Sequence, residues 1–119
     1  HGNGESNNFI HLGFRPKLLV IKRVDTASTL HNWYVVDSVR STTNVSNPID
    51  FGDILCWDKN FIEGKLDSGA GAANVSGAYI DFCSTGFNCK SSSTGYNNAS
   101  GKYVYMAWAE QPAKFSNAR

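Results

Sequence analysis

The sequence predicts an all-β domain, an antiparallel two-sheet β-sandwich of the jelly-roll or lectin-like kind with long loops. No helical periodicity persists for more than about two turns, which is too short to indicate a helix. Short stretches rich in Val, Ile, Tyr, Phe and Trp recur instead, separated by Gly, Asn, Ser, Asp and Pro, as in antiparallel β-proteins. The 119 residues, 41% of them apolar, are enough for one domain with a packed core.

Three strands are predicted in the first third of the chain. Residues 9–14 (FIHLGF) form the first candidate strand, which ends before Pro16 because proline cannot donate to a β-ladder. Residues 17–23 (KLLVIKR) form the second, and its apolar centre predicts a central strand that is covered on both faces. A turn over residues 25–32 then leads to a third strand at residues 33–39 (WYVVDSV).

The rest of the chain alternates short strands with longer polar segments. Further strands are expected at residues 54–57, 61–63, 78–83, 87–90 and 103–110. Surface loops are expected at residues 41–53, 64–77 and 91–101. Residues 58–60 should form a turn, and residues 84–86 should close a hairpin in which Gly86 supplies a positive φ.

The last strand, residues 103–110, has two different faces because side chains alternate along a strand. Val104, Met106 and Trp108 share one face, and their large apolar area predicts that this face points into the core. We expect the strand to be central and to complete its sheet. Tyr103, Tyr105, Ala107 and Ala109 share the other face. That face is suited to packing on a second sheet or a neighbouring subunit, and alternatively to acting as a ligand platform.

Residues 1–8 (HGNGESNN) are polar and glycine-rich, and we interpret them as a linker or the cut edge of a longer protein. The single β-sandwich domain is then expected at residues 9–119. The first residues lack a basic region followed by an apolar one, so they do not predict a signal peptide. A net charge of +1 does not favour nucleic acid. The longest apolar run, residues 18–21, is far shorter than the roughly 20 residues of a membrane span, so no membrane insertion is expected.

Several segments resemble the C-terminal domains of bacteriophage tail-fibre and virion structural proteins. Residues 98–112 look like the "NASG…YIYMAFAE.P" ending of that family. Residues 9–23 are similar to its "F…GF.P..V.IKR" opening, and residues 33–40 to its "W..YDS.R" segment. Residues 81–87 are similar to its "DFLSNGFKLR" hairpin. The resemblance covers nearly the whole chain in the expected order.

The resemblance implies a non-catalytic virion domain, in particular a tail-fibre module that binds glycans or other receptors on the host surface. It also implies a homotrimer, with other virion proteins as further partners and the Tyr–Ala face of the last strand as the expected contact surface. Such a protein is assembled in the host cytoplasm and acts outside the cell. A purely structural role in capsid decoration or fibre assembly is the alternative, and a glycan depolymerase is a third.

The candidate ligand-binding residues are aromatic and amide side chains that flank loops. Trp57 stands beside Asp58, Lys59 and Asn60, so a sugar could stack on the ring while polar groups on the same turn bind its hydroxyls. Trp33 begins a predicted strand, and burial at a strand end is the alternative for both tryptophans. The loop before the last strand adds three further candidates, Tyr96, Asn97 and Asn98.

The sequence predicts no enzymatic activity, no cofactor and no metal centre. Its acidic residues form no marked catalytic pair, and a Gly-x-Ser-x-Gly nucleophile motif does not occur. Asp50 and Asp53, with Asn47 nearby, could help to hold calcium, but capping of a turn by these side chains is the preferred interpretation. The odd number of cysteines, 56, 83 and 89, favours free and partly buried thiols. Cys83 and Cys89 flank the predicted hairpin turn, so pairing between them stays open.

Overall fold

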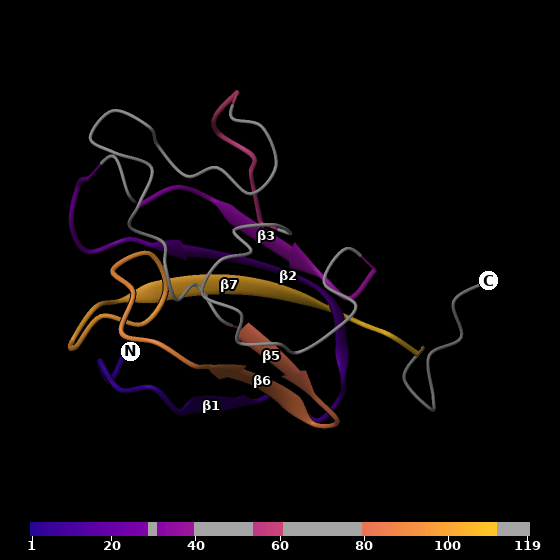
Figure 1. Cartoon of the computed structure of the whole chain (residues 1–119). Coiled ribbons are helices and arrows are strands. Elements are labelled where there is room, and N and C mark those ends of the chain that lie inside the picture. The colour runs from indigo at the N-terminus through magenta and orange to yellow at the C-terminus, as the bar shows by residue number, and fades with distance from the viewer. Residues whose placement is uncertain (29–30, 40–53, 61–79, 112–119) are drawn as a thin grey trace.

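The computed structural model describes residues 1–28, 31–39, 54–60 and 80–111, which form β-strands and no helix (Figure 1). The described strands are β1 (Asn8–His11), β2 (Pro16–Arg23), β3 (Tyr34–Asp37), β4 (Ile54–Cys56), β5 (Ile80–Cys83), β6 (Gly86–Cys89) and β7 (Tyr103–Ala109). The predicted loops 41–53 and 64–77, the predicted strand 61–63 and the proposed calcium ligands lie outside the described residues. None of the described chain forms a helix of the length and apolarity that crossing a membrane would require.

The described strands form two antiparallel sheets, which confirms the predicted β-sandwich. One sheet has the order β4-β3-β2-β7 and the other has the order β1-β6-β5. Figure 1 shows the three-stranded sheet lying on one side of the four-stranded sheet. The strand β2 pairs with β3 on one side and with β7 on the other, so it is central as its apolar sequence predicts.

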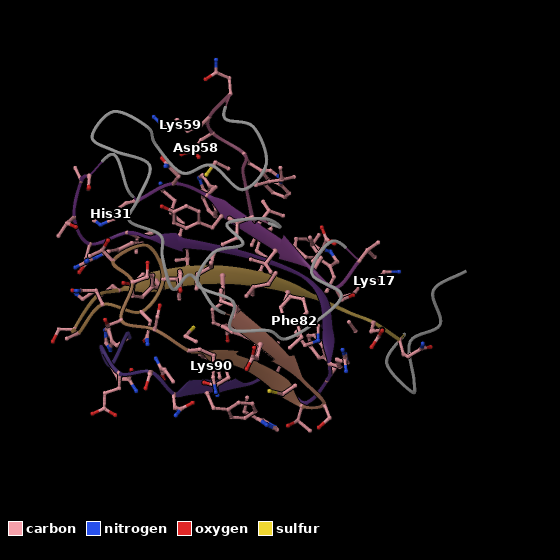
Figure 2. All side chains as sticks on the ribbon, in the orientation of Figure 1. Lys17, His31, Asp58, Lys59, Phe82 and Lys90 are labelled. Atoms are coloured by element: carbon pink, nitrogen blue, oxygen red, sulfur yellow. The ribbon has the colours of Figure 1, made fainter. Side chains whose placement is uncertain are left out.

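The core lies between the two sheets. In the four-stranded sheet, Leu19, Val36 and Ile54 stand opposite one another in the register and point to the same side. Phe82 and Phe87 enter the core from the three-stranded sheet, and Figure 2 labels Phe82 between the layers. The strand β2 is buried on both faces, because the neighbouring residues Leu19 and Val20 are each 0% exposed.

The strand β7 corrects two predictions about the last strand. It is the outermost strand in the described order of its sheet and is not central. The Val104, Met106 and Trp108 side chains are 43%, 44% and 47% exposed, so they do not enter the core. The other face packs inward in part, because Tyr103 and Ala107 lie against the buried cluster whereas Tyr105 is 42% exposed. The predicted packing of that Tyr–Ala face on a second sheet is therefore confirmed for Tyr103 and Ala107.

The geometry of the second sheet explains which face of β7 points inward. Ala107 lies opposite Leu19 in the register, where a small side chain lets the facing sheet come close. The Phe87 ring of β6 then meets the Tyr105 ring edge-on, with 5.5 Å between centroids. Aromatic pairs favour this T-shaped geometry. The orientation of β7 therefore depends on how its side chains pack against the three-stranded sheet, and not on their apolar area alone.

The expected linker at residues 1–8 is instead held within the folded domain. Asn97 is 0% exposed, and its side chain is the centre of this attachment. Its Oδ1 accepts hydrogen bonds from the Asn3 backbone N–H at 3.1 Å and from Asn8 Nδ2 at 2.7 Å. Its Nδ2 donates to the carbonyl oxygens of Glu5 at 2.8 Å and Ser91 at 3.0 Å. The first residues therefore pack on the loop before β7.

Backbone hydrogen bonds reinforce this attachment of the N-terminal residues. Gly2 N–H donates to the Gly101 carbonyl at 2.8 Å, and Ser100 N–H donates back to the Gly2 carbonyl at 3.1 Å. Gly4 N–H donates to the Asn97 carbonyl at 3.0 Å. A glycine is needed at position 2, because a Cβ there would overlap the Asn98 carbonyl oxygen.

The hairpin of β5 and β6 forms as predicted, but Gly86 has a different role from the expected one. Its φ is not positive; the described glycines with positive φ are Gly4 and Gly13. Gly86 belongs to β6, where it pairs with His11 of β1, and a Cβ on it would overlap the Ile10 carbonyl oxygen. The glycine is required for the close approach of β1 to β6.

Gly86→Ala should therefore lower the free energy of unfolding by about 2 kcal/mol, since the added methyl forces β1 away from β6. Gly13→Ala is the matched control, with a φ of 81° and nothing within 4 Å of the added Cβ. It should cost only the left-handed backbone strain of about 1 kcal/mol. Urea denaturation measures both. Equal losses in the two variants would contradict the steric role of Gly86.

Candidate functional site

An open pocket lies at one end of the four-stranded sheet. Ile21, Tyr34 and Cys56 stand side by side in the register of three antiparallel strands. The chain after β2, the chain before β3 and the chain after β4 therefore all leave the sheet at this end. Together they surround a pocket with a volume of about 460 Å³, within the usual range for ligand pockets. Figure 2 labels His31, Asp58 and Lys59 at this end, and Lys17 at the opposite one.

Two hydrogen bonds fix the turn after β4 to the start of β3, and a third closes the turn itself. Trp33 N–H donates to Asp58 Oδ1 at 3.1 Å, and Trp57 N–H donates to the Trp33 carbonyl at 3.1 Å. Lys59 N–H closes the turn by donating to the Cys56 carbonyl at 3.4 Å. The Asp58 and Lys59 side chains are thereby held at the pocket, with Trp57 next to them.

His31 shapes the floor of the pocket from the loop between β2 and β3. It is buried, and its Nδ1 lies 3.1 Å from the Thr26 carbonyl oxygen and 3.2 Å from Thr26 Oγ1. His31 N–H donates to the Ser28 carbonyl at 3.1 Å, which closes the loop on itself.

Two basic side chains at the end of β2 line the pocket in different ways. Lys22 Nζ donates to the His31 carbonyl at 2.5 Å and lies 5.6 Å from the centroid of the Trp33 ring. Arg23 binds Asp25 instead, with 2.6 Å between Nε and Oδ1. The hydrogen bond from the Arg23 guanidinium lowers the pKa of Asp25 to about 2. Arg23 is therefore paired with a carboxylate, whereas Lys22 is held by neutral groups.

The structure brings four of the seven predicted ligand-binding residues to this end of the sheet. Asp58 lines the pocket, Trp57 and Asn60 are exposed on the same turn, and the Trp33 ring lies beneath Lys22. Trp57 is 57% exposed, so the alternative of a buried tryptophan does not describe it.

The other three predicted residues, Tyr96, Asn97 and Asn98, do not line this pocket. Tyr96 is buried, and its hydroxyl lies 2.7 Å from Ser91 Oγ. Asn97 uses its amide group to bind the N-terminal residues and Ser91. Asn98 N–H donates to the Tyr103 hydroxyl at 2.8 Å. These three residues hold their loop in place in the described conformation.

The sequence prediction missed the loop that supplies most of the pocket. Lys22, Thr26, His31 and Asn32 all line it, but residues 25–32 were interpreted as a simple turn. The available signal was the pair of basic residues that ends an otherwise apolar strand. The basic residues at the end of β2 form a site only together with the turn at residues 57–60. The sequence does not show that this turn, which is distant along the chain, lies beside them.

The three cysteines are free thiols. Cys83 stands opposite Gly86 in the hairpin, whereas Cys89 stands opposite Ile80, so the register separates the two sulfurs. Burial raises the pKa of Cys89 to about 12, and burial followed by the nearby Asp58 carboxylate raises that of Cys56 to about 11. Within the described ranges, no three His, Cys, Asp or Glu side chains gather as a metal site.

These burial differences predict which thiol reacts in the native protein. With a pKa of about 11, Cys56 has roughly one thiolate per thousand molecules at pH 8, and Cys89 has fewer. Iodoacetamide should therefore modify the half-buried Cys83 first and reach Cys56 and Cys89 only after denaturation. Peptide mass spectrometry after timed alkylation gives the order. Rapid modification of Cys89 in the folded protein would contradict its burial.

Comparison with known proteins gives one family and no further relative. Neither a curated protein nor a solved structure matches the chain. The family described as "Domain of unknown function (DUF7483)" matches residues 1–112. This match includes the N-terminal residues that Asn97 holds and every described strand. The chain therefore belongs to the DUF7483 family.

Proposed function

We propose that the chain is a non-catalytic domain of a phage virion, a tail-fibre module that binds saccharides on the host surface. The resemblance of residues 9–23, 33–40 and 98–112 to tail-fibre domains supports the virion assignment. The site at the end of the four-stranded sheet supports saccharide binding. A module of this kind is carried on the particle and acts outside the cell.

The observation that carries the proposal is an exposed tryptophan, Trp57, directly before two residues that line a polar pocket. Trp57 is 57% exposed, and the next two residues, Asp58 and Lys59, line the pocket. A ring in this position offers an apolar surface to the C–H groups of a sugar. Hydroxyl groups of the same sugar can then bind the carboxylate and amide groups of the pocket. This division between an apolar platform and polar partners is typical of small-ligand sites.

The proposed assembly is a homotrimer, in which several weak sites act together. Linked sites raise overall binding by roughly 10²–10⁴ when geometry lets them engage at once. Tyr103 and Ala107 pack on the core of the same chain, so the Tyr–Ala face of β7 offers a neighbouring subunit mainly the Tyr105 side chain, which is 42% exposed.

A purely structural virion role is the second candidate, and the exposed row on β7 favours it. Val104, Met106 and Trp108 project from one face of the strand and are each more than two-fifths exposed. Such a row suits contact with another virion protein. Tight binding of the isolated domain to capsid or tail components, with no competition for adsorption to host cells, would support this role.

Trp57→Ala should abolish or weaken saccharide binding by at least tenfold while the thermal unfolding midpoint stays unchanged, because the side chain is exposed. The measurement is binding to an array of bacterial surface polysaccharides. Trp108→Ala is the matched control, since it removes an exposed tryptophan from β7, away from the pocket. Equal binding by wild type and Trp57→Ala would exclude the platform, and release of reducing ends would show a depolymerase instead.

A further inference from the structure

The charges around the pocket are unequal. Lys22, Arg23 and Lys59 bring three cationic groups to its lining, and Asp58 brings one carboxylate. The Arg23 charge is offset by its ion pair with Asp25. Two lysines and one aspartate therefore set the charge that a bound molecule meets.

The Lys22 ammonium group is held in place without being neutralised. Its two described partners are the His31 carbonyl oxygen and the face of the Trp33 ring, and both are uncharged. An ammonium group has three N–H donors, and the carbonyl uses one of them. The lysine is also partly buried, and a partly buried charge is stabilised by an opposite charge.

Lys59 brings a second cation to the pocket from the turn after β4. It is exposed on the turn after β4, and the turn is fixed by its backbone hydrogen bonds. Among the residues that the structure describes, the ion pairs involve other cations, and no carboxylate pairs with Lys22 or Lys59. Asp58 Oδ1, the nearest acidic group in sequence, accepts the Trp33 N–H.

We infer that the pocket binds the acidic group of an anionic saccharide, a carboxylate or a phosphate, between Lys22 and Lys59. The inference rests on the proposed saccharide binding and specifies its substrate class. The sugar ring stacks on Trp57, and the acidic group enters the pocket.

Matched pairs of sugars test the inference, with NMR titration of the backbone amide signals of His31, Asn32 and Lys59 as the measurement. Galacturonate is compared with galactose, and glucose 6-phosphate with glucose, so that each pair differs in the acidic group. One charged sugar should bind about tenfold more tightly than its neutral partner, as expected for a charge-assisted hydrogen bond. Which charged sugar binds more tightly then distinguishes carboxylate from phosphate.

Variants of the two lysines assign the effect to the pocket. Lys59→Gln should weaken binding of the charged sugar by about tenfold and leave the neutral sugar unchanged. Lys22→Gln should do the same, with the thermal midpoint measured because Lys22 also binds the His31 carbonyl. Lys17→Gln, at the opposite end of the sheet, is the control and should have no effect (Figure 2).

Three outcomes would overturn the inference. The first is equal binding of charged and neutral sugars with no effect of Lys59→Gln; loss of array binding in Trp57→Ala would then leave the proposed function standing. The second is binding of inorganic phosphate as tight as that of glucose 6-phosphate, which would show a simple anion site. The third is no shift of the pocket signals with any of the four sugars. Saccharide binding as the proposed function is then tested separately, by binding of wild type and Trp57→Ala to the polysaccharide array.

Discussion

Phe87→Ala is expected to lower the free energy of unfolding by about 4 kcal/mol, the largest effect of any single change considered. Phe87 is 0% exposed and packs from β6 into the core between the sheets. Truncation removes its contacts and leaves a cavity that the surrounding strands cannot fill. It also removes the edge-on partner of the Tyr105 ring. Urea denaturation followed by circular dichroism gives the change directly.

Phe9→Ala is the matched control for this experiment. Phe9 lies on β1 and is 48% exposed, so its truncation should cost about 1 kcal/mol or less. The urea dependence of the unfolding free energy should stay the same in both variants, because the native fold is kept. A similar loss at both positions would mean that β6 does not supply the centre of the core.

Asn97→Ala is expected to lower the free energy of unfolding by about 3 kcal/mol. The side chain makes four hydrogen bonds and is completely buried, so its removal leaves several polar groups without a partner. The attachment of residues 1–8 should weaken as a consequence. Hydrogen exchange of the Asn3 amide should accelerate by more than the global change in stability explains, since this N–H loses its acceptor, Asn97 Oδ1.

Asn98→Ala provides the control, because the described hydrogen bonds of Asn98 use its backbone N–H and carbonyl groups. Its stability should therefore stay within about 0.5 kcal/mol of wild type. If Asn97→Ala were equally mild, the N-terminal residues would not be held by this amide. Deletion of residues 1–6 is a second test of the attachment. An unchanged midpoint of unfolding in that variant would contradict it.

A strand could be predicted from the sequence where its pattern of apolar and turn residues is compatible with a single arrangement. The apolar centre of β2 required cover on both faces, and the hairpin of β5 and β6 was marked by turn residues. The orientation of β7 was not predictable in the same way. Alternation shows that Met106 and Trp108 share a face, but both faces of β7 carry apolar side chains. The choice depends on Phe87, which is distant in sequence and reaches Tyr105 from the facing sheet.

Long-range polar contacts were the second limit of the sequence. Residues 1–8 have the composition of a linker, and the partner that holds them, Asn97, is about ninety positions away. The same limit applies to the site. Residues 57–60 were predicted as a binding turn because a tryptophan there is followed directly by polar side chains. Lys22 and His31 join the site only through the register of β2, β3 and β4. The residue types in one segment predict which side chains can line a pocket, and the pairing of the strands determines which of these segments lie together.

The pairing of β1 with β6 has a consequence for synthesis on the ribosome. Asn8 pairs with Cys89, so the first strand leaves the ribosome several seconds before its partner at about 5–20 residues per second. During this delay Ile10 and Leu12, which later pack on the core, have no sheet to join. The nascent chain therefore exposes these apolar side chains until β6 is made. A chaperone that holds extended segments should raise the yield of this domain, and premature termination before β6 should send the product to proteolysis.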